Sequence, residues 1–244
     1  MNTFFRILIF INAFVLLSCK EEKKEQPKVI YEESVAKQVT SEIEKTEPSQ
    51  IKIADLPIHI EGTNFLLHPV GDVRVYESNG KLYGSSRANS VSFSISNYNR
   101  FELTGYLENI KIQHKDSVNL RLLTDKKVQI QTVTYPQAFS EKTKKQLLIY
   151  TLVDKDTNRD GILDSNDIKS LYISEIDGNN FTKLSSDYHE LIDWNIIEPQ
   201  SRLYFRTIED INKNGAFDKN DSLHYHFVNL LQKEWVIEKY APVN

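Results

Sequence analysis

The sequence predicts an all-β domain over residues 51–244, and two observations support this. From residue 51 onward, apolar residues recur at every second position in short runs, which is the period of a half-buried strand. Clusters of Asn, Asp, Ser and Gly separate the runs, as hairpin turns require. Many short strands joined in this way are typical of a β-sandwich or a propeller-like array. The runs expected to form strands are 51–53, 57–60, 65–70, 73–76, 91–95, 101–106, 110–113, 118–123, 128–134, 147–153, 171–176, 191–197, 203–208, 223–228 and 235–240.

The clearest turn signals lie at 78–80, 97–99, 177–180 and 198–199. Helical patterns are rare in this part of the chain, and only residues 140–146 favour a helical turn. We therefore expect strands, hairpin turns and a single short helix.

The composition limits the classes of function. The chain has 244 residues, 30 of them basic and 34 acidic, so its net charge is −4. This length can bury one sizeable core or two small ones. A net acidic chain offers no basic surface for a phosphate backbone, so we expect no nucleic-acid partner. Cys19 is the single cysteine, which excludes an internal disulfide and a cysteine-based zinc site.

Residues 1–19 are expected to form a signal peptide outside the fold. Arg6 precedes an apolar run at 7–17, which would span roughly 16 Å as a helix and fall short of the ~30 Å bilayer core. The run ends in Leu-Leu-Ser-Cys at 16–19, which resembles the bacterial lipobox. The resemblance implies that Cys19 is lipidated and anchors the mature chain to a membrane. The alternative is an ordinary signal peptide with a chance cysteine.

Residues 20–50 are expected to form a charged, flexible tether. Fourteen of these thirty-one residues are charged, so the segment has little apolar surface with which to offset its chain entropy. Lys20-Glu21-Glu22 resembles the short export signal of surface lipoproteins in Bacteroidetes. That resemblance implies an outer-membrane lipoprotein facing the periplasm or the cell surface. A generic charged linker is the alternative explanation.

The second half of the domain carries a further resemblance. Residues 171–185, Leu-Tyr-Ile-Ser-Glu-Ile-Asp-Gly-Asn-Asn-Phe-Thr-Lys-Leu-Ser, resemble the last hairpin of a TolB-type β-propeller repeat. Asp-Trp-Asn at 193–195 and Arg-Leu-Tyr-Phe at 202–205 are similar to the start of the next blade. The chain departs from the family at 198–201, where Glu-Pro-Gln-Ser replaces Pro-Asp-Gly. The resemblance covers roughly residues 145–240 and implies four small blades or an incomplete propeller-like array.

A repeated twelve-residue pattern is the sharpest functional signal. Residues 156–167 and 210–221 both place oxygen-bearing side chains at positions 1, 3, 5, 9 and 12 and glycine at position 6. Ca²⁺ takes six to eight oxygen ligands, so alternate residues of a tightly curled backbone must point inward, and the carbonyl at position 7 completes the set. The predicted ligands are Asp156, Asn158, Asp160, Ile162, Asp164 and Asp167 in the first copy, and Asp210, Asn212, Asn214, Ala216, Asp218 and Asp221 in the second.

Both copies resemble EF-hand loops, and the aspartate at position 12 makes them similar to dockerin and thrombospondin type 3 loops. Strands are expected on both sides of each loop, so we predict a structural calcium ion rather than an opening switch. The first copy has four carboxylates and the second has three, because Asn214 replaces the acid at position 5. Fewer charges lower calcium affinity, so we expect the first site to be the tighter one.

Other candidate residues carry weaker signals. His224 and His226 lie two apart on an expected strand and could share a metal, but no third ligand is evident and a polar strand face explains them. Asp187, His189 and Glu190 are interpreted as solvated loop residues. No nucleophile elbow, P-loop or zincin helix occurs in the sequence.

The expected function is therefore a non-enzymatic, calcium-binding lipoprotein with a binding or structural role. Its expected partners are the membrane, through the lipid anchor, and an envelope protein or a glycan. The alternative is a surface or periplasmic hydrolase, for example one acting on glycans. A groove lined by convergent carboxylates and aromatic residues away from both loops would favour the hydrolase.

Overall fold

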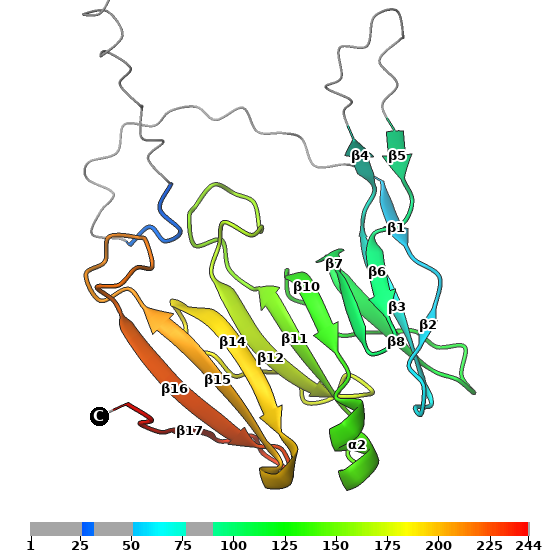
Figure 1. Cartoon of the computed structure of the whole chain (residues 1–244). Coiled ribbons are helices and arrows are strands. Elements are labelled where there is room, and N and C mark those ends of the chain that lie inside the picture. Colours follow the sequence, from blue (N-terminus) through cyan, green and yellow to red (C-terminus); the bar gives the residue numbers. More distant parts are fainter. Residues whose placement is uncertain (1–25, 32–50, 77–89, 244) are drawn as a thin grey trace, which may run out of the picture.

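The computed structural model describes residues 26–31, 51–76 and 90–243, and the strands within 51–76 and 90–243 form antiparallel β-sheets (Figure 1). The first sheet contains β1 (Lys52–Ala54), β2 (Ile58–His59), β3 (Phe65–Asp72), β8 (Asn109–His114) and β9 (Arg121–Leu122). A separate two-stranded ribbon pairs β4 (Arg74–Tyr76) with β5 (Ser90–Ser92). The prediction of an all-β fold is confirmed.

The other two sheets contain the predicted calcium loops. The second sheet has the strand order β13-β12-β11-β10-β7-β6, and the third has the order β14-β15-β16-β17. The strands of the second sheet are β6 (Ser96–Asn99), β7 (Glu102–Leu107), β10 (Gln129–Thr134), β11 (Leu147–Val153), β12 (Lys169–Glu175) and β13 (Thr182–Lys183). Those of the third are β14 (His189–Ile197), β15 (Arg202–Glu209), β16 (Ser222–Asn229) and β17 (Ile237–Lys239).

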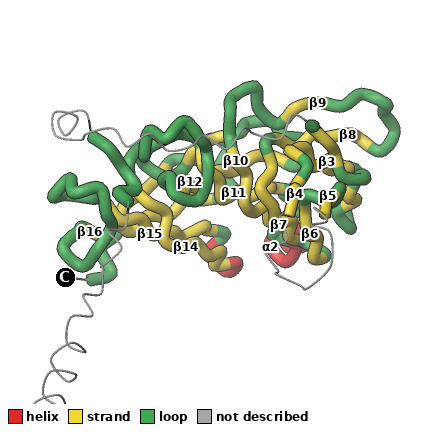
Figure 2. The backbone as a smooth tube through the Cα atoms, turned by 90° about the horizontal axis from the view of Figure 1, so that it is seen from above, coloured by secondary structure: helices red, strands yellow, loops and turns green. Residues whose placement is uncertain are grey.

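The three sheets stack in layers, with the six-stranded sheet in the middle. Seen from above, β14–β16 lie on one side, β10–β12 in the centre, and β3 and β8 on the other side (Figure 2). Two separate cores fill the spaces between the layers. Because side chains alternate along a strand, Leu148 and Tyr150 of β11 enter the first core, while Leu147 and Ile149 enter the second.

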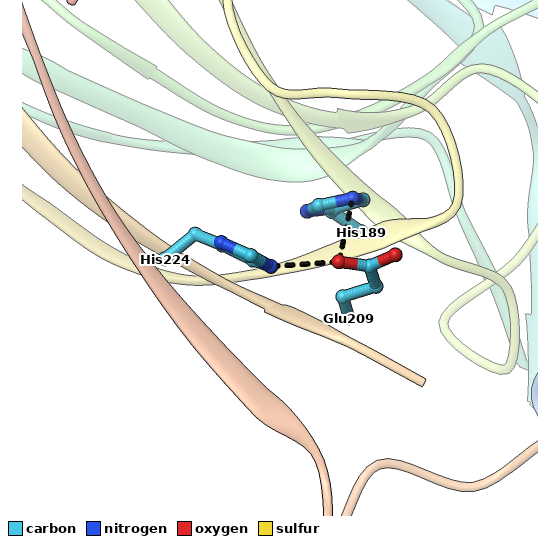
Figure 3. A group of neighbouring side chains, drawn as sticks. All are labelled: His189, Glu209 and His224. Atoms are coloured by element: carbon cyan, nitrogen blue, oxygen red, sulfur yellow. Dashed lines mark hydrogen bonds and ion pairs between the residues drawn. The ribbon is translucent and has the colours of Figure 1, made fainter. Parts of the chain in front are cut away.

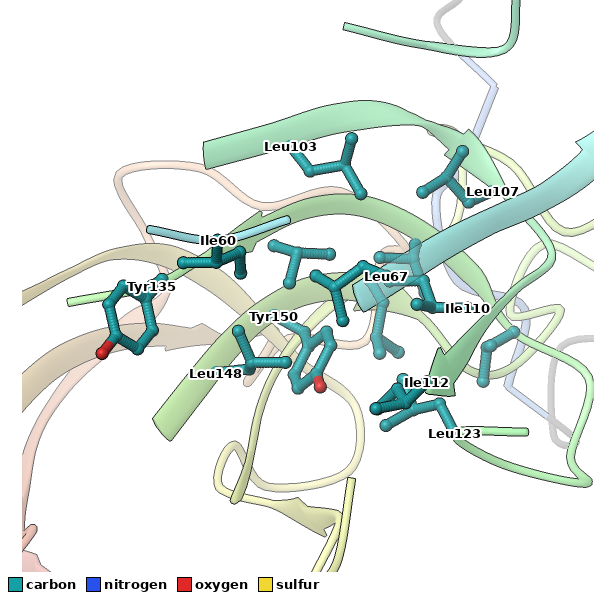
Figure 4. Packing of buried hydrophobic residues seen from close by; sticks show 14 of the residues in the cluster. Ile60, Leu67, Leu103, Leu107, Ile110, Ile112, Leu123, Tyr135, Leu148 and Tyr150 are labelled. Carbon is teal, nitrogen blue, oxygen red and sulfur yellow. The ribbon is translucent and has the colours of Figure 1, made fainter. Parts of the chain in front are cut away.

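The first core joins the first and second sheets, and Figure 4 shows its packing. Leu67 of β3 and Ile110 of β8 lie against Ile130 of β10 and Tyr150 of β11, and all four are 1% exposed or less. The second core joins the second and third sheets through residues such as Phe205. The chain length allowed either one sizeable core or two small ones, and the described residues form two.

Three local predictions are corrected or fall outside the described residues. Residues 97–99 are part of strand β6 and not a turn, because Asn97 pairs with Thr104 and Asn99 with Glu102 of β7. The only α-helix of the described residues, α2 (Gln137–Thr143), begins after Pro136 and is therefore three residues earlier than predicted. It ends where Lys144 takes a left-handed conformation. The turn expected at 78–80 lies outside the described residues.

The sheet arrangement shows meanders but does not show propeller blades. Strands β10–β13 and β14–β17 are two successive four-stranded antiparallel meanders. In each meander, the predicted calcium loop joins the second strand to the third. The second sheet, however, continues past β10 through β7 and β6, which makes it larger than a four-stranded blade.

Candidate metal-binding loops

The two predicted loops lie at the same end of neighbouring sheets (Figure 1). We call residues 156–167, between β11 and β12, the first loop and residues 210–221, between β15 and β16, the second loop. Their backbones repeat one another closely. At position 4, Arg159 and Lys213 have φ values of 60° and 53°, and at position 6, Gly161 and Gly215 have φ values of 87° and 83°. The glycines therefore occupy the left-handed conformation that the predicted turn requires.

Backbone amides curl each loop around its polar side chains. The position 1 carboxylate accepts the amide of position 6, at 2.9 Å in the first loop and 2.7 Å in the second. The position 3 side chain accepts the amide of position 5, and the position 5 side chain accepts that of position 7. The position 12 carboxylate accepts the amide of position 9, at 3.1 Å and 2.8 Å. The residues in these contacts are Asp156, Asn158, Asp160, Gly161, Ile162, Asp164 and Asp167, and Asp210, Asn212, Asn214, Gly215, Ala216, Asp218 and Asp221.

Each loop also leaves one carboxylate oxygen buried without a hydrogen-bond partner. These atoms are Oδ1 of Asp156, at position 1 of the first loop, and Oδ1 of Asp221, at position 12 of the second. Burying an anionic oxygen without a partner is unfavourable. A cation held by the loop would supply the missing partner, so the residues present fit a hard, oxygen-preferring ion such as Ca²⁺.

The loops differ in how their carboxylates are engaged. Asp167 is fully buried, and its Oδ1 accepts the amides of Thr157 at 2.6 Å and Asn158 at 3.1 Å. Burial raises the pKa of Asp167, against the lowering effect of its backbone hydrogen bonds. Asp154, next to the first loop, accepts hydrogen bonds from Tyr172 and Lys183 at 2.7 Å each. Its carboxylate is therefore engaged by side chains of β12 and β13.

The loop carboxylates alone are not tightly gathered. Within the described residues, the only group of three His, Asp or Glu side chains with ligand atoms within 4.8 Å of one another lies elsewhere. Calcium loops complete their coordination with amide oxygens, a backbone carbonyl and water. The Asn side chains at positions 3 and 5 therefore belong to the candidate site together with the aspartates.

A short segment near the N-terminus packs across both loops, and we call residues 26–31 the strap. The amides of Lys28 and Val29 donate to the carbonyl of Gly215, at 2.6 and 3.2 Å, and the amide of Ile30 donates to that of Thr157 at 2.9 Å. Thr157 Oγ1 donates back to the carbonyl of Lys28 at 2.9 Å. Val29 is only 2% exposed. The strap is thus bonded to position 2 of the first loop and position 6 of the second.

Side chains of the strap add further contacts. Lys28 Nζ donates to Glu190 Oε1 at 2.7 Å. The ring of Tyr31 lies 6.2 Å from that of Tyr188. Burial, together with the negative charge of Asp210 and a hydrogen bond to it, raises the pKa of Tyr31 to about 12. The strap therefore touches position 1 of the second loop directly. Its residues fall in the range expected to be a solvated tether, whereas residues 20–25 and 32–50 lie outside the described residues, as does Cys19.

The structure also brings together residues that the sequence did not connect. His224 lies beside His189 and Glu209, as Figure 3 shows. Burial lowers the pKa of His189, against the raising effect of Glu209. His226 instead stacks on Phe205, with ring centroids 4.9 Å apart, and burial lowers its pKa to about 4. The His–Glu–His contact depends on the pairing of three strands, so spacing along the sequence carried no signal for it.

The chain matches no model of a protein family, and no curated protein is similar enough to count as a relative. Among the described residues, no helix has the length and apolar character needed to cross a membrane.

Proposed function

We propose that this chain is a calcium-stabilised lipoprotein, anchored through Cys19 at the outer membrane and facing the periplasm or the cell surface. Its role in this proposal is non-enzymatic, either binding or structural. The observation that carries the proposal is the pair of loops, which share one backbone conformation and each hold a buried, unpartnered carboxylate oxygen. The occurrence of two such loops, fifty-four residues apart, supports a pair of cation-binding sites rather than two unrelated polar turns.

The loops support a structural role for the ion. Each loop closes a hairpin between two strands, and the strands on both sides are paired along their lengths. Strands flank both loops in the described residues, in place of the helix pair whose angle changes when a calcium sensor binds its ion. An ion that binds only the folded state stabilises it by RT ln(1 + [L]/Kd), which is about 2.7 kcal/mol at a hundredfold excess over Kd.

The strap connects the proposed anchor at Cys19 to the calcium loops. Six residues lie between Cys19 and Gln26, and the seven residue steps of a fully extended chain would reach about 25 Å at most. The strap binds both loops, so in this proposal the loops form the end of the protein that faces the membrane. Calcium would then fix the orientation of the three sheets relative to the bilayer.

A cleft of about 670 Å³, lined by β9 and the β9–β10 connection together with β12 and β13, supports a binding role over the hydrolase alternative. Four basic residues contribute to its lining, Arg121, Lys126, Lys127 and Lys183, and Tyr172 and Phe181 add stacked rings 4.8 Å apart. It has two carboxylates, Asp125 and Asp154, of which Asp154 is paired with Lys183. This lining lacks the convergent free carboxylates of a glycan hydrolase. It suits an anionic glycan or an acidic envelope protein.

Thermal unfolding of the full chain tests the proposal. Calcium is expected to raise the midpoint relative to a chelator, and Mg²⁺ is expected to replace it poorly, because Mg²⁺ demands a smaller octahedral site. Asp156→Ala should remove more of the calcium effect than Asp210→Ala, because the first loop has more carboxylates. Asp125→Ala, which removes an exposed acid outside both loops, is the matched control. A midpoint that chelation leaves unmoved in the wild type would exclude both loops as calcium sites.

A further inference from the structure

Three adjacent strands of the third sheet converge on one small cluster of side chains. His189 is the first residue of β14, Glu209 the last of β15, and His224 the third of β16. His189 and Glu209 are directly opposite one another in the β14–β15 register. His224 is opposite Thr207 and therefore lies diagonal to Glu209. Neighbours of these two kinds meet on one face of a sheet, and Figure 3 shows both rings directed at the carboxylate.

The distances suit a small divalent ion. His224 Nε2 lies 2.8 Å from Glu209 Oε2, and His189 Nε2 lies 3.8 Å from the same oxygen. All three ligand atoms fall within 4.8 Å of one another. In a tetrahedral zinc site with bonds of about 2.0–2.1 Å, ligand atoms are about 3.3 Å apart. These two distances lie on either side of that value, and the third pair of ligand atoms is no more than 4.8 Å apart, so rotations of the side chains, without a change of the backbone, are expected to admit the ion.

The surroundings of the cluster also match a metal site. His189 Nδ1 lies 3.4 Å from Oγ1 of Thr207, which is fully buried. A contact of this kind fixes the ring and directs Nε2 toward the metal position. The side chains of His189, His224 and Glu209 are 16%, 24% and 45% exposed, so the cluster opens to solvent on one side. The positive charge of Lys239 acts on His189 and would repel a bound metal ion.

We propose that His189, Glu209 and His224 form a binding site for a divalent transition-metal ion, with Zn²⁺ as the best match. Two imidazoles and one carboxylate are a common set of three protein ligands for zinc, and they leave a fourth position for water or an added ligand. Imidazole nitrogen is a poor ligand for Ca²⁺, which takes oxygen. The site therefore differs in ligand chemistry from both loops, although Glu209 directly precedes Asp210, position 1 of the second loop.

The test is a titration of the full chain with Zn²⁺ alone after chelator treatment and dialysis, in buffer with saturating Ca²⁺ to keep the loops filled. The wild type is expected to bind one equivalent of Zn²⁺. His224→Gln is expected to weaken this binding by more than about 100-fold, the upper limit for losing an outer partner of a ligand. His114→Gln is the matched control. His114 is the last residue of β8 in the first sheet, and it also lies near a carboxylate, that of Asp116 at 3.7 Å. Its zinc affinity should equal that of the wild type.

A second measurement on the wild type protects the test against a variant that fails to fold. Co²⁺ in a four- or five-coordinate nitrogen and oxygen site absorbs visible light, and its unpaired electrons shift the ring proton resonances of the histidines that bind it. We expect both signals, with the shifts confined to His189, His224 and their neighbours. Three results would overturn the proposal: no saturable Zn²⁺ or Co²⁺ binding by the wild type, equal affinity in a folded His224→Gln variant, or competition by Ca²⁺ for this site.

Discussion

The docking of the strap on the second loop can be tested with two glycines that occupy the same position in different loops. Gly161 and Gly215 both have left-handed φ values, 87° and 83°. Alanine in that conformation costs about 1–2 kcal/mol. A Cβ at Gly161 would meet no atom within 4 Å, whereas a Cβ at Gly215 would lie 2.5 Å from the carbonyl oxygen of Val29 and 2.6 Å from Cβ of Pro27. Gly161→Ala therefore measures backbone strain alone, and Gly215→Ala adds a collision with the strap.

The energies indicate that this collision is enough to displace the strap. Burying Val29 contributes about 2 kcal/mol, the four backbone and hydroxyl hydrogen bonds about 1 kcal/mol each, and the Lys28–Glu190 pair about 1 kcal/mol. Ordering six residues costs about 1–2 kcal/mol each. The favourable and unfavourable sums are within a few kcal/mol of one another. Because the strap is held so weakly, a contact shorter than 3 Å with the new Cβ is expected to displace it from the second loop.

The assay is amide hydrogen exchange in peptides that cover the strap, supported by trypsin cleavage after Lys28. We expect Gly215→Ala to bring strap exchange close to that of a free chain and to expose the bond after Lys28. Gly161→Ala should lower the free energy of unfolding by about 1–2 kcal/mol while the strap stays protected. Val29→Asp tests the same docking by changing the strap instead of the loop, because it places a charge at a buried position of the strap. Val118→Asp is its control, because Val118 is 90% exposed. Unchanged strap protection in both Gly215→Ala and Val29→Asp would refute the docking.

Two further predictions concern the anchor and the layered fold. Cys19→Ala is expected to release the protein from membranes or to leave the precursor unprocessed, which fractionation and mass measurement would show; normal processing and membrane association would exclude lipidation. Leu148→Ala and Ile149→Ala are each expected to destabilise the protein by about 2–5 kcal/mol in denaturant unfolding, because both side chains are fully buried, in different cores. In a two-layer sandwich, one of these neighbours would face solvent and its loss would have little effect.

Most of the fold could be predicted from local patterns. The run at 147–153 matches the bounds of β11, because an apolar stretch of this length between polar turns has few other structures available to it. The failure at 97–99 has a physical cause. Asn favours turns, but the pairing of Asn97 and Asn99 with β7 outweighs this local preference. The turn instead falls at Arg100, which has a positive φ of 32°.

The backbone of the candidate sites was predictable only where their residues are close in sequence. Each loop lies within twelve residues, so its curled conformation followed from spacing. The strap was not predictable from the sequence. It lies within a range of mostly charged and polar residues, which predicts a solvated tether, yet Val29 within it is buried. The His–Glu–His cluster was hidden by its origin on three strands. Its central member, Glu209, stands directly before Asp210 and reads as part of the calcium loop in the sequence.

The position of Glu209 and Asp210 links the features at this end of the protein. Glu209 is the last residue of β15 and reaches the histidines, whereas the next residue, Asp210, begins the second loop and contacts Tyr31 of the strap. If calcium in the second loop orders Asp210, it also favours docking of the strap. Linkage is reciprocal, so the factor by which the strap raises calcium affinity equals the factor by which calcium raises strap docking. The strap, which leads toward the proposed anchor, and the calcium ion are thereby expected to stabilise one another.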